Sequence, residues 1–178
     1  MKYSFLILFL SIIFYQSLAQ NIYEPLKISE NIISIDGIID QKEWDKAVKI
    51  ELNYETQPGY NIKPIVETTG YMIYSDYHIY LRFDAKTRET VRASVRKRDD
   101  NGIFNDDIIG IVIDTYGDGR NNLFIGSNPY GSQMDVRVLN SIMEQSRYDI
   151  SYDIEYESAG SINGNSYQIE MKIPFSSL

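Results

Sequence analysis

The side chains that carry most enzyme chemistry are scarce in this sequence. Cysteine is absent, and His78 is the single histidine among 178 residues. The lack of cysteine excludes disulfides, thiolate zinc sites and thiol nucleophiles. A histidine cluster is excluded too, and a Ser-His-Asp triad would depend on His78 alone. Chemistry therefore falls to carboxylates, amides, guanidinium groups and aromatic rings.

Two adjacent carboxylates, Asp106 and Asp107, are the first candidates for acid–base work. Glycoside hydrolysis needs two carboxyl groups that face each other across the scissile bond, roughly 5 to 9.5 Å apart. Asp106 and Asp107 precede an apolar run at 108–113 that is typical of a strand, and neighbours on a strand point to opposite faces. The pair cannot flank one substrate, so we expect a protein that is not an enzyme.

Clusters of side-chain oxygens point to calcium. Residues 99–101 and 114–119 are rich in Asp, and hard cations bind clustered oxygens. The second loop does not match the EF-hand pattern, because Tyr116 occupies its third position and Ile125 its twelfth. Two interpretations stay open, structural calcium or metal-free Asp and Gly turns. No other cofactor is expected.

Composition and charge restrict the class of protein. Apolar residues make up 43% of the chain and charged residues 24%, as in a globular domain. The formal net charge of −8 repels phosphate backbones, so nucleic acid is excluded as a partner.

The first nineteen residues resemble a secretory signal peptide. Lys2 precedes an apolar run at 5–15, and Gln16-Ser17-Leu18-Ala19 follows it. The run is too short for a transmembrane helix, which takes about 20 residues. We expect cleavage after Ala19 and export to the periplasm, outer membrane or extracellular space. Residues 20–178 would form one domain that stops directly after a strand, as a truncated domain would.

The remaining pattern has a period of two, which is typical of antiparallel strands with one exposed face. The run at 108–113 is almost continuously apolar and predicts a central strand. Alternating segments lie at 79–84, 134–138, 150–157 and 169–173. Short turns between them favour an all-β antiparallel β-sandwich.

One short N-terminal helix is predicted beside the strands. Asp40 can cap it and Glu43 would complete a capping box. Trp44, Ala47 and Val48 would form its apolar face.

The segment Ile35-Asp36-Gly37-Ile38-Ile39-Asp40, with Glu43-Trp44 and Ala47, resembles the start of carbohydrate-binding module family 9. The rest is similar to one branch of that superfamily, the N-terminal domain of large exported Bacteroidetes-type proteins whose remainder looks like an outer-membrane barrel. The matching segments are 74–76 with 79–81, 96–99, 106–110, 114–115, 124–131 with Gln133 and Asp135, and 170–178.

The resemblance implies a DOMON-like sandwich that binds sugars. It places five polar residues on adjoining strand ends, where they would hydrogen-bond sugar hydroxyls: Arg96, Arg98, Asp106, Asp107 and Asn128. An internal ion-pair network is the alternative for this group. Sugar-binding relatives hold the ring between two tryptophans, but Trp44 is the single tryptophan here and lies in the predicted helix. Tyrosines in predicted loops would have to substitute: Tyr60, Tyr116, and above all Tyr130 and Tyr148.

Three functions therefore compete. The first is a non-catalytic module at the cell envelope that captures a glycan end, oligosaccharide or polysaccharide in a loop-lined cleft. The second is a docking domain of a larger outer-membrane barrel protein that binds no sugar. The third is an accessory fragment of a glycan-degrading hydrolase.

Overall fold

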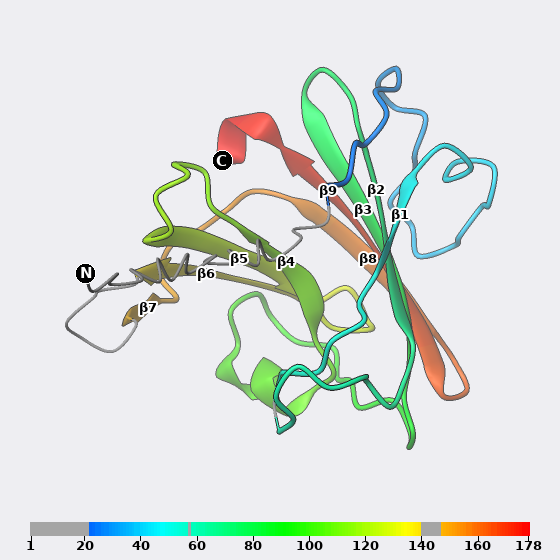
Figure 1. Ribbon diagram of the computed structural model, residues 1–178, viewed down its shortest axis with the longest axis vertical. Helices are drawn as coiled ribbons and strands as arrows, with labels where there is room; N and C mark the ends of the chain where they lie inside the picture. The colour runs from blue at the N-terminus through cyan, green and yellow to red at the C-terminus, as the bar shows by residue number, and fades with distance from the viewer. Residues whose placement is uncertain (1–21, 57, 140–146) are drawn as a thin grey trace, which may run out of the picture.

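Two facing antiparallel β-sheets make up the protein (Figure 1). The computed structural model describes residues 22–56, 58–139 and 147–178. The predicted signal peptide, residues 1–19, lies outside the described residues. Within the described ranges, no helix has the length and apolar character needed to cross a membrane. The all-β antiparallel sandwich predicted from the period-two pattern is confirmed.

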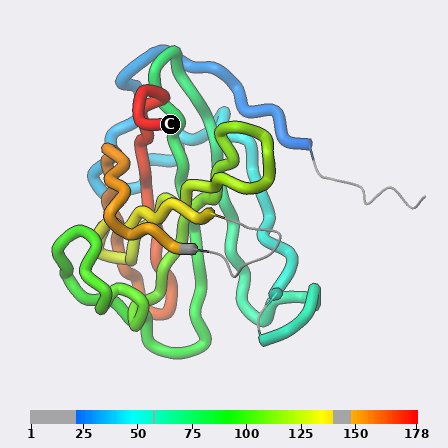
Figure 2. Tube along the Cα trace, turned by 90° about the vertical axis from the view of Figure 1, so that its left-hand side faces the viewer, coloured from blue at the N-terminus to red at the C-terminus, as the bar shows by residue number. Residues whose placement is uncertain are grey.

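Five strands form one sheet in the order β1-β2-β3-β9-β8, and four form the other in the order β4-β5-β6-β7. In the view turned by 90°, the yellow segment that contains β6 crosses the red segment that contains β9 (Figure 2). The strands of the first sheet are β1 (Val48–Glu51), β2 (Thr68–Tyr74), β3 (His78–Lys86), β9 (Ser166–Pro174) and β8 (Glu157–Asn163). Those of the second are β4 (Ile109–Ile113), β5 (Asn121–Ser127), β6 (Gln133–Leu139) and β7 (Arg147–Asp149). Two 3-10 helices are η1 (Asn101–Asn105) and η2 (Phe175–Ser177).

The main core lies between the two sheets and follows from the alternation of side chains along each strand. Leu81 and Phe83 of β3 and Ile169 of β9 pack in one cluster with Leu123 and Ile125 of β5. Burying each such side chain stabilises the fold by roughly 1.5–3 kcal/mol. The predicted strands at 79–84, 134–138 and 169–173 are confirmed within β3, β6 and β9.

An N-terminal arm, residues 28–47, covers part of the outer face of the five-stranded sheet. Ile33 and Trp44 of this arm are buried against Ile73 of β2 and Tyr80 of β3. The face of β3 that was predicted to be exposed is therefore buried at Tyr80.

No helix forms between Asp40 and Val48, so the predicted short N-terminal helix is wrong. The backbone N–H of Glu43 donates to the Asp40 carbonyl, and that of Ala47 donates to the Trp44 carbonyl, both at 3.1 Å. These bonds join residues three apart and produce two successive turns. So short a segment forms a helix only with strong support from packing, and Val48 is already committed to β1.

Strand β4 lies at the edge of its sheet, so the predicted central position is wrong. Ile111 and Ile113 pack against the core, whereas Val112 on the opposite face is 62% exposed. The apolar sequence of β4 therefore determined neither how many strands lie beside it nor whether both of its faces are covered.

Residues 150–156 do not form the strand predicted at 150–157, although their side chains alternate between more exposed and more buried positions as predicted. Ile154 and Tyr156 are buried, but their backbone groups bind side chains of β6. The N–H of Ile154 donates to Asp135 Oδ2 at 2.6 Å, and the Tyr156 carbonyl accepts from Gln133 Nε2 at 2.7 Å. β8 begins at Glu157, where backbone pairing with Lys172 of β9 starts.

Candidate functional site

The structure brings Arg96, Asp106 and Asn128 together, and they bind one another. Arg96 Nε donates to Asp106 Oδ2 at 2.7 Å, and a second guanidinium nitrogen donates to Oδ1 at 2.9 Å. Asn128 Nδ2 donates to Asp106 Oδ2 at 2.8 Å. The hydrogen bond from Arg96 holds the pKa of the Asp106 carboxyl below its ordinary value. The arrangement is the internal network that the sequence left open as the alternative.

Asn128 is fully buried and supports a turn. Its Oδ1 accepts hydrogen bonds from the backbone nitrogens of Tyr130 and Ser132, both at 3.0 Å. Its Nδ2 also donates to the Ser94 carbonyl at 2.7 Å. The amide is thus used within the protein, and no surface of Asn128 is left for a ligand.

Arg98 joins β6 to the extended segment at 150–156. Its Nη2 donates to the carboxylate of Asp135 and to the Ile154 carbonyl, and its Nη1 donates to Gln133 Oε1 at 3.2 Å. The guanidinium carbon lies 5.4 Å from the centre of the Tyr156 ring. Asp135 is fully buried, so Arg98 is the counter-charge that allows a carboxylate at this position.

Asp107 has partners of its own. Its Oδ2 accepts from the backbone nitrogen of Arg92 at 2.8 Å, and its Oδ1 lies 3.5 Å from the Arg92 guanidinium. Asp106 and Asp107 are therefore each paired with a different arginine. The pKa of Asp106 is lowered by its hydrogen bond from Arg96, whereas a general acid would require a raised pKa.

The four tyrosines predicted to lie in loops are all exposed: Tyr60, Tyr116, Tyr130 and Tyr148. Tyr116 borders a cavity of about 230 Å³ near the β4–β5 hairpin. Tyr148 lies in strand β7, so its predicted position in a loop is wrong. It borders a cavity of about 690 Å³. Tyr148 is the predicted site residue that the structure places beside other aromatic rings.

This larger cavity, which we call the outer-sheet groove, lies on the outer face of the four-stranded sheet. Strand register aligns two rows of side chains across its floor: Val112, Phe124 and Val136 in one, and Asn122, Val138 and Tyr148 in the other. The full lining consists of Phe104, Val112, Asn122, Phe124, Val136, Val138, Tyr148 and Ile150. None of these side chains carries a charge.

Helix η1 supplies a wall of the groove. Asp100 caps η1 by accepting a hydrogen bond from Gly102 N at 2.7 Å. Ile103 of η1 is buried in a cluster with Met134 and Val136 of β6. This packing anchors the helix on the outer face of the sheet and leaves the next residue, Phe104, 64% exposed at the groove.

Two paired glycines allow close packing at the floor of the groove, one against the Phe124 ring and the other against the backbone of β5. A Cβ on Gly126 would lie 2.5 Å from Cζ of Phe124, so the Phe124 ring occupies space that any other residue would fill. Gly110 is paired with Gly126 across β4 and β5. A Cβ on Gly110 would lie 2.2 Å from the Ile125 carbonyl oxygen.

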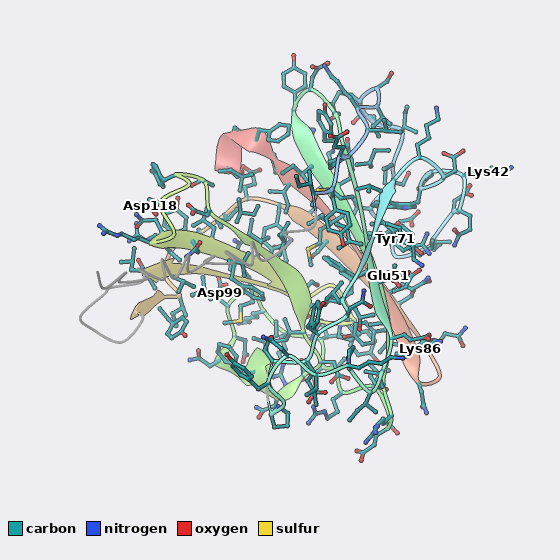
Figure 3. All side chains as sticks on the ribbon, in the orientation of Figure 1. Lys42, Glu51, Tyr71, Lys86, Asp99 and Asp118 are labelled. Carbon is teal, nitrogen blue, oxygen red and sulfur yellow. The ribbon has the colours of Figure 1, made fainter. Side chains whose placement is uncertain are left out.

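The Asp-rich loops use their carboxylates within turns. Asp114 accepts hydrogen bonds from the backbone nitrogens of Gly117 at 2.8 Å and Gly119 at 2.7 Å. Asp118, at the far end of the β4–β5 hairpin in Figure 3, accepts from Arg120 N at 2.7 Å, and such backbone donors lower its pKa. In residues 22–56, 58–139 and 147–178, no group of three or more His, Asp or Glu side chains is placed to hold a metal ion. The geometry favours the turn interpretation of these loops.

Of the eight residues that line the groove, only Tyr148 was predicted as a site residue, and the aromatic and polar residues that were missed are Phe104, Asn122 and Phe124. Asn122 and Phe124 alternate with the buried Leu123 and Ile125, so a strand with one outward aromatic could have been inferred. Phe104 follows no such period. Its position depends on where η1 packs.

Comparison with known proteins confirms the fold. Neither a protein-family model nor a curated protein matches the sequence. Among solved structures, a candidate carbohydrate-binding protein from Bacteroides uniformis is 16% identical with a TM-score of 0.63, covering 86% of this chain and 72% of its own. A family 9 carbohydrate-binding module from Caldicellulosiruptor kristjanssonii is similar in two complexes. The cellotriose complex shows 14% identity, a TM-score of 0.54 and coverage of 86% and 68%, and the glucose complex shows 13%, 0.55, 86% and 70%. The chain thus has a fold like that of family 9 carbohydrate-binding modules, as the sequence resemblance implied.

Proposed function

We propose that this protein is a non-catalytic carbohydrate-binding module and that the outer-sheet groove is its binding site. The observation that carries the proposal is the grouping of three aromatic rings, from Phe104, Phe124 and Tyr148, around one uncharged groove. Its volume of about 690 Å³ is within the usual range for small-molecule sites. The likeness of the fold to modules solved with cellotriose and glucose supports the choice of ligand class.

The lining suits a pyranose ring. Sugars present an apolar face of C–H groups, which stacks on aromatic rings, and hydroxyl groups that need hydrogen bonds. The Tyr148 and Phe104 side chains are exposed enough to stack from the walls, and Phe124 forms part of the floor. Asn122 offers both a donor and an acceptor. Tyrosine and phenylalanine thereby supply the aromatic stacking surface, because the single tryptophan, Trp44, is buried.

Binding without bond cleavage is the chemistry that these groups allow. Hydrolysis would require opposed carboxylates with separated pKa values, and no carboxylate lines the outer-sheet groove. We further propose that the module works at the cell envelope after export and captures a glycan end or oligosaccharide there. A downstream outer-membrane barrel would be its carrier in a longer protein.

Calorimetric titration of the protein with glucose, cellotriose and a panel of neutral oligosaccharides tests this function. We expect at least one dissociation constant in the micromolar to millimolar range, on the order of −4 to −8 kcal/mol. Tyr148→Ala and Phe104→Ala should each weaken binding about tenfold without lowering the melting temperature. The control is Tyr60→Ala, since Tyr60 is even more exposed than Tyr148 and Phe104 but lies outside the groove. Equal losses in all three variants, or no binding to any sugar, would refute the assignment.

One observation favours the docking function instead. Among the described residues, no strand pairs with the outer edge of β4, and its sequence Ile-Gly-Ile-Val-Ile has no charge or proline to prevent another strand from pairing with it. Absence of sugar binding together with β4-dependent association with an outer-membrane barrel would support this second function.

A further inference from the structure

The outer-sheet groove is more apolar than an unsubstituted sugar requires. Four of its eight lining residues are aliphatic: Val112, Val136, Val138 and Ile150. Polar groups at the groove are limited to the Asn122 amide and the Tyr148 hydroxyl. A hydroxyl group that leaves water for an aliphatic surface without a hydrogen bond loses free energy. A plain hexose carries hydroxyls on most of its carbons, so part of it would be poorly matched.

The Asn122 amide is available to a ligand. Among the described residues, no group hydrogen-bonds the Asn122 side chain, in contrast to the neighbouring Asn121, whose Nδ2 donates to Asp118 at 2.9 Å. Strand register places Asn122 directly beside Val138, which in turn lies beside Tyr148. An amide donor, an aliphatic side chain and an aromatic ring thus follow one another across the floor.

The charges of the groove and of the whole protein restrict the charge of the ligand. The lining carries no charged side chain, and the whole chain has a formal net charge of −8. An acidic sugar would enter an apolar groove without a counter-charge on an anionic protein, and both features are unfavourable for it. The ligand expected from this complementarity is neutral.

We propose that the groove selects neutral glycans that carry acetyl groups over the same glycans without them. An acetyl group has a carbonyl oxygen that accepts a hydrogen bond and a methyl group that packs on aliphatic carbon. Asn122 Nδ2 donates to the carbonyl, Val138 and Val136 contact the methyl, and the sugar ring stacks on Tyr148. The proposal rests on the proposed function and specifies the substrate class of the same groove.

The test compares two pairs of ligands with and without acetyl groups. Tri-N-acetylchitotriose has the β-linked backbone of cellotriose with an acetamido group in place of each C2 hydroxyl. O-acetylated xylo-oligosaccharides are compared with the same sample after mild alkaline deacetylation, so this second pair differs in the acetyl groups alone. We expect calorimetry to give about tenfold tighter binding to the acetylated member of at least one pair. Which pair responds identifies the source of the acetyl group as an amide or an ester.

Two variants connect the preference to its residues. Val138→Thr keeps the side-chain shape but places a hydroxyl against the methyl group, and Asn122→Asp replaces the amide donor with a carboxylate that repels the carbonyl. Each should reduce the acetyl preference to about twofold or less, whereas Val95→Thr and Asn163→Asp, at exposed positions outside the groove, should preserve it. Circular dichroism melting shows whether each variant is folded, and either variant alone suffices if the other is not.

The outcomes separate this proposal from the one on which it rests. Acetylated and plain sugars that bind within about twofold of each other overturn the acetyl preference and leave carbohydrate binding intact. A preference that survives both groove variants overturns it as well. If no sugar of either kind binds, both proposals fail.

Discussion

The indole nitrogen of Trp44 donates a hydrogen bond to Oε1 of Glu170 at 3.1 Å, across 126 residues of sequence. The other carboxylate oxygen of Glu170 accepts from the backbone nitrogen of Gly37 at 3.1 Å. Glu170 is fully buried in β9, and burial raises the pKa of its carboxyl while these donors oppose the rise. The pair therefore attaches the N-terminal arm to the outer face of the five-stranded sheet, away from the outer-sheet groove.

Replacing Trp44 with phenylalanine should destabilise the protein by about 3 kcal/mol, because it removes buried volume and leaves a buried acceptor without its donor. Urea unfolding followed by circular dichroism measures the loss, since the variant has no tryptophan fluorescence. In a double-mutant cycle with Glu170→Gln, we expect a coupling of about 1 kcal/mol or more. Strict additivity of the two changes would show that the hydrogen bond has no energetic role.

Arg98→Ala should cost about 3 kcal/mol or more, because the fully buried carboxylate of Asp135 would lose its counter-charge. Arg92→Ala is the matched control, since the Arg92 side chain is 74% exposed beside Asp107 and its ion pair should contribute within about 0.5 kcal/mol. Chemical denaturation of both variants checks the difference. If Arg98→Ala instead abolished sugar binding with unchanged stability, Arg98 would be a ligand contact.

Gly110→Ala and Gly126→Ala should have unequal effects, although the two glycines are paired. At Gly110 the new methyl meets the Ile125 carbonyl oxygen, which cannot move without disturbing the sheet. Overpacking of this kind costs about 3 kcal/mol. At Gly126 it meets the mobile end of the Phe124 ring, so stability should stay within about 1 kcal/mol, while the displaced ring weakens ligand binding. Thermal melting and titration together test the contrast, and equal destabilisation would contradict it.

Stability should decrease in acid partly through Glu30. Hydrogen bonds from Ser75, the backbone of Tyr77 and His78 lower the pKa of Glu30 from 4.5 to about 2. Glu30 binds a proton less readily in the folded state than in the unfolded state. It therefore stabilises the folded state above pH 4.5, and this stabilisation is lost as the pH falls towards 2.

The measurement is the slope of unfolding free energy against pH between these two values. Glu30→Gln should reduce the slope by up to one proton, whereas Glu89→Gln, at an exposed position, should leave it unchanged. A slope that is identical in the wild type and in Glu30→Gln would rule out this role for Glu30.

The sequence by itself determined the strands and their two-sided alternation, but not which face of β6 points inward, since Asp135 lies beside the core residue Ile125 and Val136 faces the outer-sheet groove. The alternation of apolar and polar residues in β3, β6 and β9 predicts strands because a residue's face is a local property of the extended backbone. The resemblance to family 9 modules likewise followed from local motifs, and the fold confirms it. The local sequence pattern gave a wrong prediction where contacts with distant residues decide the backbone conformation. It predicted a helix at Trp44, whose indole is instead bound by Glu170 on a distant strand.

The tertiary structure alone decided where a ligand can bind. Arg96, Asp106 and Asn128 have the residue types of a sugar site, but they lie close enough to satisfy one another. Phe104 and Tyr148 are 44 positions apart in the numbering and become walls of one groove only when η1 packs on β6 and the register of β7 is set. Exposure and proximity depend on contacts between distant segments, and no property of a single segment contains that information.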